Sequence, residues 1–229
     1  MRQPLTVAEI LAVLASPDSI GDLRSYFHGV ADAAYTGGQF EMLGGGGSRP
    51  TVANTVTAED LIAVELLGVT IRPRRRLDLL QGQLGRDVSA ALATIPTDVE
   101  LDEDDALAYI VDGGAADTAW RLLRDTPGIG WVIAGKLLAR KRPRLVPVYD
   151  HVVSCAYGTR SGFWEWLHDT LREDTAAVSR RLDALHREAE LAPPVSRLRV
   201  LDVVFWMRHR EDHLPSDCPG LRLPASVER

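Results

Sequence analysis

One short turn constrains this chain more than any other stretch. Pro127, Gly128 and Gly130 belong to the sequence P-G-I-G, which lies between two segments of helical periodicity. Glycine reaches backbone angles closed to other residues, and its missing Cβ lets another backbone approach closely. The second helix would direct its positive dipole end and free N–H groups at the turn, an arrangement that binds phosphate. The pattern predicts a helix over residues 115–124, a tight hairpin and a second helix.

Basic residues are concentrated just after the hairpin. The net charge of −6 argues against a protein that coats nucleic acid generally, but a local basic face is compatible with DNA binding. Five cations fall within nine residues, and we predict that they bind nucleic acid together with the hairpin glycines: Lys136, Arg140, Lys141, Arg142 and Arg144.

The stretch from the hairpin to Asp150 resembles the helix-hairpin-helix DNA glycosylase superfamily. The resemblance rests on the P-G-I-G hairpin, on Ala134 in the next helix and on Asp150, twenty residues after Gly130. It implies that the amides of Gly128 and Gly130 bind a DNA phosphate and that hairpin carbonyls hold a monovalent cation, with no other cofactor. It also implies that Asp150 is the catalytic carboxylate, at the mouth of a pocket for a flipped base.

The sequence departs from the family pattern in three places, and these bear on the catalytic residue and on the type of glycosylase that the resemblance implies. His151 follows Asp150 directly, so a one-residue shift would put Tyr149 in the place of the carboxylate. Val132 occupies the position of the lysine that forms a Schiff base in bifunctional members, which favours a monofunctional, divergent enzyme. The chain has only two cysteines, too few for the iron–sulfur cluster of another branch.

Helical periodicity in most of the chain predicts an all-α, multi-helix fold. The resemblance implies two helical subdomains flanking a cleft. We divide the chain into an N-terminal helical region over 1–100, a helix-hairpin-helix region over 101–214 and a coil tail over 215–229. The first region contains a glycine-rich loop at 36–50, and its helices either stand apart or pack with the C-terminal helices.

Asp150 has two compatible interpretations. A carboxylate near C1′ of the sugar would stabilise the positive charge that develops when an N-glycosidic bond breaks. Aspartate is also a favoured helix N-cap, and His151 begins an apolar helical segment. Aromatic side chains near Asp150 either wall a base pocket or belong to the core, and the pocket candidates are Trp131, Tyr149, Trp164 and Trp166.

These observations leave three hypotheses for function. The first is a DNA-binding, monofunctional glycosylase of base excision repair, a hydrolase that acts through Asp150. The second is a helix-hairpin-helix module that grips nucleic acid without catalysis. The third is a helical protein that kept the fold and binds a small molecule or a protein partner.

Metal sites and membrane segments are not predicted. His209 and His213 have helical spacing and lie near Cys218, but Pro215 interrupts the segment and no metalloprotease motif is present, so we assign no metal. No apolar run approaches the ~20 residues of a membrane span, and no signal peptide is evident. Two distant cysteines fit a reducing compartment, so we expect a cytoplasmic protein with DNA as its partner.

Overall fold

The structure is a computed structural model of the chain and describes residues 3–28, 35–158 and 161–223. These residues form α-helices and two short 3₁₀-helices without any β-strand, which confirms the predicted all-α class. None of the helices in the described ranges is long and apolar enough to cross a membrane. The elements are α1 (Val7–Leu14), α2 (Asp18–Phe27), η1 (Thr36–Gln39), η2 (Leu43–Gly45), α3 (Ala58–Glu65), α4 (Pro73–Gln81), α5 (Gln83–Leu92), α6 (Ala106–Ile110), α7 (Ala115–Arg124), α8 (Gly130–Lys141), α9 (His151–Tyr157), α10 (Phe163–Glu188) and α11 (Arg197–His209).

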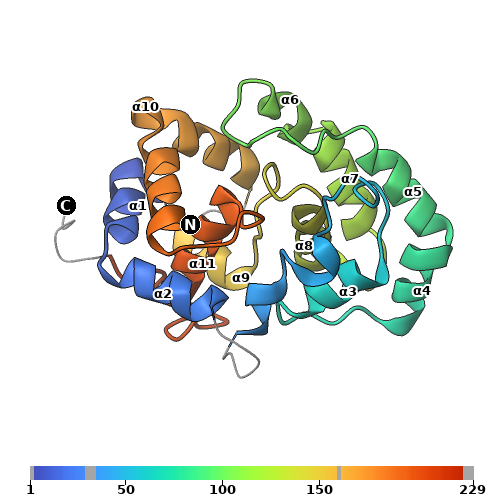
Figure 1. Cartoon of the computed structure of the whole chain (residues 1–229), viewed down its shortest axis with the longest axis horizontal. Coiled ribbons are helices and arrows are strands. Elements are labelled where there is room, and N and C mark those ends of the chain that lie inside the picture. The colour runs from blue at the N-terminus through green and yellow to red at the C-terminus, as the bar shows by residue number, and fades with distance from the viewer. Residues whose placement is uncertain (1–2, 29–34, 159–160, 224–229) are drawn as a thin grey trace.

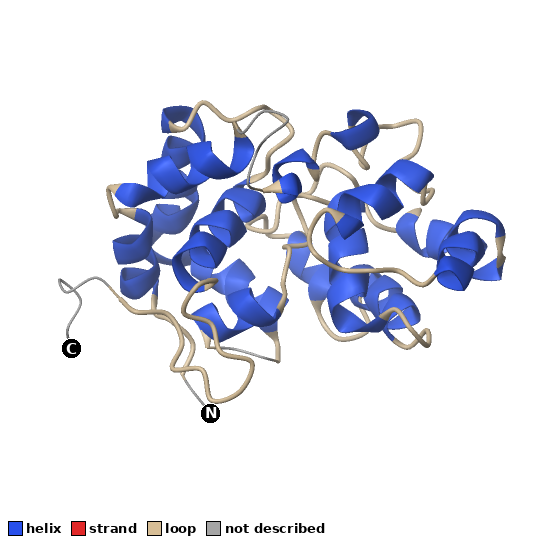
Figure 2. Cartoon of the chain, turned by 90° about the horizontal axis from the view of Figure 1, so that it is seen from below, coloured by secondary structure: helices blue, strands red, loops and turns tan. Residues whose placement is uncertain are grey.

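The helices form two groups that lie side by side (Figure 1). One group contains α1, α2, α9, α10 and α11, and the other contains α3 to α8. The chain therefore leaves the first group after α2 and returns to it at α9. This packing crosses the boundary that we predicted at residue 100, because α1 packs on α10 while α3 packs on α8. Figure 2 shows the same two groups from below.

Local capping explains where several helices begin. Thr6 and Glu9 form a capping box at α1, and Thr57 and Asp60 form another at α3. The side chain of Ser196 accepts a hydrogen bond from the backbone N–H of Arg199 at the start of α11. These polar side chains satisfy N–H groups that a helix leaves without intrahelical partners.

The predicted hairpin joins α7 to α8. Gly128 and Gly130 have φ angles of +89° and +69°, in the left-handed region that strongly favours glycine. Between them, Ile129 is buried and anchors the turn in the core, while both glycines are exposed. The hairpin therefore presents its backbone to solvent.

Candidate functional site

Arginines from α4 and from its N-cap flank the hairpin. Arg75 donates a hydrogen bond from Nε to the backbone oxygen of Pro127, at 2.8 Å. A Cβ built on Gly128 would lie 3.5 Å from Cδ of Arg72, so the Arg72 side chain runs beside the turn. Arg72 and its neighbour Arg74 are exposed. The exposed hairpin thus has guanidinium groups around it, contributed by a segment more than fifty residues earlier in the chain.

The arginine contact also bears on the monovalent cation that the resemblance implies. Such an ion would be held by hairpin carbonyl oxygens. The oxygen of Pro127 already accepts a hydrogen bond from Arg75, which brings a positive charge to the same turn. In the observed arrangement the Pro127 carbonyl is therefore already bonded to an arginine donor.

Four of the five predicted nucleic-acid-binding cations lie inside the protein, and this corrects the predicted basic face. Arg140 and Lys141 both contact the carboxylate of Asp60, at 3.0 Å and 2.6 Å. All three side chains are about 1% exposed. The cations therefore neutralise a buried acid on α3 and hold α3 against α8. They are not positioned to meet a ligand at the surface.

The buried Arg142 has a similar structural role. Its guanidinium donates to the backbone oxygens of Ala53, Leu92 and Ile95 and to the side chain of Asn54. Burial lowers the pKa of Arg142 to about 10, which still leaves it charged near neutral pH. Only Arg144, with a side chain 54% exposed and 3.5 Å from Glu100, remains at the surface.

Asp150 is the N-cap of α9, as one of the two interpretations predicted. Its Oδ1 accepts hydrogen bonds from the backbone N–H groups of Val152 and Val153, at 3.0 Å and 3.1 Å. Its Oδ2 lies 3.4 Å from Nζ of Lys136. The Lys136 amine also donates to the backbone oxygen of Leu67, at 2.9 Å. Burial lowers the pKa of Lys136, and attraction to Asp150 opposes that shift.

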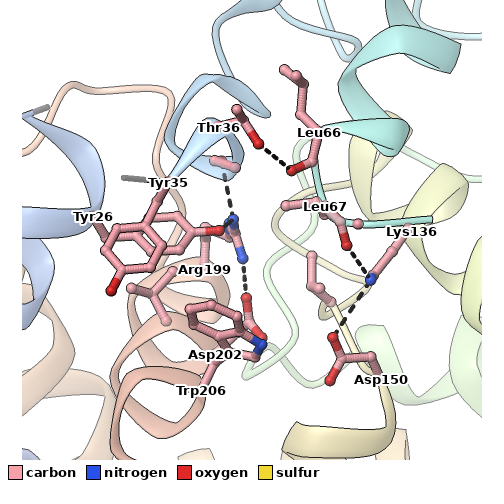
Figure 3. Close-up of a pocket in the computed structure, with 14 residues that line it drawn as sticks. Tyr26, Tyr35, Thr36, Leu66, Leu67, Lys136, Asp150, Arg199, Asp202 and Trp206 are labelled. Atoms are coloured by element: carbon pink, nitrogen blue, oxygen red, sulfur yellow. Dashed lines mark hydrogen bonds and ion pairs between the residues drawn. The ribbon is translucent and has the colours of Figure 1, made fainter. Parts of the chain in front are cut away.

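Asp150 faces a cavity of about 220 Å³ between the two groups of helices, which we call the Asp150 pocket (Figure 3). One wall comes from α2, from α11, and from Tyr35 with the first residues of η1. The other wall comes from the end of α3, from α8 and from the start of α9. Thr36 bridges the walls by donating a hydrogen bond from Oγ1 to the backbone oxygen of Leu66. The carboxylate side chain is 18% exposed, so it is reachable from this cavity.

Three aromatic rings line the pocket on the wall opposite Asp150. Tyr26 and Tyr35 stack with ring centroids 5.3 Å apart. Trp206 meets both rings edge to face, at 5.9 Å and 5.8 Å. Figure 3 shows these rings across the cavity from Lys136 and Asp150. No sequence pattern indicates this aromatic wall, since its members come from opposite ends of the chain.

A buried ion cluster supports the aromatic wall. Arg199 donates to the Tyr26 hydroxyl at 2.7 Å, and its Nε lies 2.8 Å from the carboxylate of Glu41. It also pairs with Asp202, one turn further along α11. Burial raises the pKa of Asp202 to about 7, with the negative charge of Asp150 adding to the shift and Arg199 opposing it. The pocket therefore contains two carboxyl groups in different environments.

Three of the four predicted aromatic residues line a different and larger cavity. Trp131, Tyr149 and Trp164 border a groove of about 1330 Å³, which we call the Trp131 groove. The fourth candidate, Trp166, packs against Tyr157 and Phe163 at centroid distances of 5.5 Å and 5.7 Å. The sequence therefore located aromatic side chains near the hairpin, but not the ones that share a cavity with Asp150.

Tyr149 and Asp150, the two alternatives for the catalytic position, border different cavities. Tyr149 stacks on Phe163, with ring centroids 3.9 Å apart, and borders the Trp131 groove. Asp150 borders the smaller Asp150 pocket. His151 is exposed, and its ring lies 4.8 Å from that of Trp131. Tyr149 and His151 thus both border the Trp131 groove, and of these three consecutive residues only Asp150 lines the Asp150 pocket.

Comparison with known proteins gives one match. No curated protein and no solved structure matches the chain. A protein-family model with the description "Family of unknown function (DUF6308)" matches residues 19–209. The match includes the hairpin, Asp150 and both walls of the Asp150 pocket. The chain therefore belongs to the DUF6308 family.

Proposed function

We propose that this protein binds DNA at the Pro127–Gly130 hairpin and hydrolyses the N-glycosidic bond of a base held in the Asp150 pocket. The observation that carries the proposal is the position of Asp150, whose carboxylate faces a cavity walled by Tyr26, Tyr35 and Trp206. A flipped base needs aromatic faces and hydrogen-bonding groups to replace its stacking and pairing. The pocket offers both kinds of group within one small cavity.

Asp150 has the chemistry that this reaction requires. As the bond to the base breaks, positive charge develops on the sugar, and a fixed carboxylate stabilises it. The same carboxylate can orient the attacking water. Two backbone N–H groups hold its Oδ1 in place, so the carboxylate is oriented before substrate binds. Lys136 supplies a positive charge that compensates the carboxylate until substrate arrives.

Asp202 is the candidate for recognition of the base. Its pKa of about 7 means that a substantial fraction carries a proton near neutral pH. A protonated carboxyl can donate a hydrogen bond to a ring nitrogen or carbonyl of the leaving base, and so disperse the negative charge that the base acquires. Two carboxyl groups with different pKa values in one site are a common basis for such a division of roles.

Phosphate binding is assigned to the hairpin and α4 in place of the buried cations of α8. The exposed backbone of Gly128 and Gly130 begins a helix whose N-terminus favours an anion. Arg72 lies beside this turn, and Arg72 and Arg74 are both exposed, so they can pair with neighbouring phosphates. A hairpin with two arginines is a small basic footprint, which fits a protein of net charge −6.

A second candidate is a small-molecule-binding protein that uses the same pocket without DNA. The burial of Lys136, Arg140, Lys141 and Arg142 favours it, because the protein lacks the broad basic face that DNA-binding proteins usually present. In that case the Asp150 pocket would bind a free planar molecule, and the Lys136–Asp150 ion pair would fix the pocket wall.

Binding to a duplex with an abasic-site analogue separates these candidates without knowledge of the lesion. We expect the protein to prefer the abasic duplex to the undamaged one and to lose affinity as salt rises. Gly130→Glu should abolish binding. Arg72→Ala and Arg74→Ala should each reduce the slope of log affinity against log salt concentration by about one. Arg187→Ala, an exposed arginine on α10, is the matched control and should bind normally. Absence of binding at low salt would reject DNA as the partner and leave the second candidate.

A further inference from the structure

Four side chains from distant parts of the sequence meet beside the Trp131 groove. Cys155 lies on α9, His209 ends α11, and His213 and Cys218 belong to the segment that follows. One potential ligand atom from each of the four lies within 4.8 Å of every other. The four side chains therefore form one cluster of potential metal ligands.

We propose that Cys155, His209, His213 and Cys218 bind one Zn²⁺ ion in a tetrahedral site. Two thiolates and two imidazoles are a preferred zinc ligand set, whereas Ca²⁺ and Mg²⁺ favour oxygen ligands. The proposal does not depend on the proposed function, because none of the four residues lines the Asp150 pocket.

The geometry is close to that of a zinc site. With Zn–S bonds of about 2.3 Å and Zn–N bonds of about 2.0–2.1 Å, ligand atoms in a tetrahedron lie roughly 3.5 Å apart. Sγ of Cys218 and Nε2 of His209 are already 3.3 Å apart. The widest separation in the group, up to 4.8 Å, would shrink by about 1 Å as the ligands close on the ion. Small side-chain rotations achieve such a change.

The imidazole of His213 gives independent support. Its Nδ1 atom is buried and has no hydrogen-bond partner among the residues that the structure describes. A buried ring nitrogen without a partner is costly, and coordination or a hydrogen bond removes that cost. The His213 ring packs edge to face on His209, with centroids 5.4 Å apart, so both imidazoles face the same small region.

Four protein ligands leave no open position, so the ion would be structural. It would fasten the segment after α11, which contains no helix or strand over the described residues 210–223, to α9. That segment also forms part of the Trp131 groove, through His213, Leu214 and Cys218 among others. The ion would therefore fix one wall of the groove and hold α9, whose N-cap is Asp150.

The test is the metal content and cobalt spectrum of the full chain. We expect protein purified under reducing conditions, without added chelator, to contain one zinc ion per chain by elemental mass spectrometry. After exchange into Co²⁺, it should show thiolate-to-cobalt charge transfer and the visible bands of tetrahedral coordination. Treatment with a strong chelator should remove the metal and lower the midpoint of thermal unfolding, and added Zn²⁺ should restore it.

Single substitutions identify the ligands. Cys155→Ser, Cys218→Ser and His213→Gln should each lower zinc affinity by more than about tenfold, since loss even of supporting groups costs this much. The two serine variants should also reduce the charge-transfer band. His28→Gln, an exposed histidine at the end of α2, is the matched control and should keep full metal content.

Two outcomes would overturn the proposal. The first is a reduced, folded wild-type protein that binds neither Zn²⁺ nor Co²⁺ and whose thermal midpoint is unchanged by chelator. The second is an intact mass lower by two hydrogens, which would indicate a Cys155–Cys218 disulfide, together with failure to take up metal after reduction. Because the wild-type spectrum is decisive, a variant that fails to fold does not weaken the test.

Discussion

The amine of Lys136 lies 3.4 Å from Oδ2 of Asp150. This contact links the helix after the hairpin to the residue at which the chain returns to the first group of helices. Lys136 is on α8, in one group of helices, and Asp150 caps α9, in the other. The pair therefore couples the two walls of the Asp150 pocket. Its side chains are 3% and 18% exposed, so solvent screens the interaction only in part.

This coupling predicts a non-additive effect on stability. Lys136→Met leaves the backbone oxygen of Leu67 without its donor and should cost about 1–3 kcal/mol. Asp150→Asn keeps a good N-cap but removes the carboxylate beside the buried Lys136 amine, and it should cost a similar amount. In a double-mutant cycle, denaturant unfolding should give a coupling energy of about 0.5–3 kcal/mol. Additivity within about 0.3 kcal/mol would mean that the two groups do not interact in solution.

The ion cluster at Asp60 predicts a large loss of stability. Asp60 is the shared partner of Arg140 and Lys141, and its removal would leave two buried cations uncompensated. Asp60→Asn should therefore lower the free energy of unfolding by about 3–5 kcal/mol. The control Asp98→Asn, at an exposed position, should change it by less than about 0.5 kcal/mol. Equal effects of the two substitutions would contradict the buried position of the α8 cations.

Two glycines of α8 provide a matched test of the hairpin conformation. Gly130 has a φ of +69°, so Gly130→Ala should destabilise the protein by about 1 kcal/mol although the added Cβ meets no atom. Gly135 lies within the same helix, and its added Cβ is equally free of contacts. Gly135→Ala should stabilise by about 0.5–1 kcal/mol. Thermal unfolding of both variants checks the predicted opposite signs.

Asp202 predicts a pH dependence of stability. Because its pKa in the folded protein is raised to about 7, the folded state holds a proton there that the unfolded chain loses near pH 4. The stabilising contribution is therefore full below about pH 4 and is lost as the pH rises through about 7. From about pH 4 to about pH 7, the free energy of unfolding of the wild type should fall relative to that of Asp202→Asn. Above about pH 7 the difference between the two proteins should stay constant. Denaturant unfolding across pH measures this, and a constant difference from pH 4 to 7 would contradict it.

The parts of the structure that local sequence patterns determine were predictable. The glycines of P-G-I-G produced the hairpin between two helices, and Asp150 before an apolar helical segment produced an N-cap. In both cases the physical cause lies within a few neighbouring residues. The all-α class followed for the same reason, since helical periodicity is a local property.

The basic run after the hairpin shows where local reasoning fails. Arg140 and Lys141 are typical of a surface that binds phosphate, but their partner Asp60 lies about eighty residues earlier in the chain. The aromatic wall of the Asp150 pocket could not be predicted for the same reason, because Tyr26 and Trp206 come together only when the last helices pack on the first. Only the three-dimensional packing brings these residues together.

Release of free base is the measurement that tests the central claim most directly. The wild-type protein would be incubated with duplexes that each carry one oxidised, alkylated or deaminated base, and free bases would be identified by mass spectrometry. We predict release from at least one duplex, with a rate constant lowered about 100-fold or more in Asp150→Asn. Affinity of that variant for the abasic duplex should stay unchanged. Release at equal rates by wild type and Asp150→Asn, or no release from any duplex, would contradict a catalytic role for Asp150.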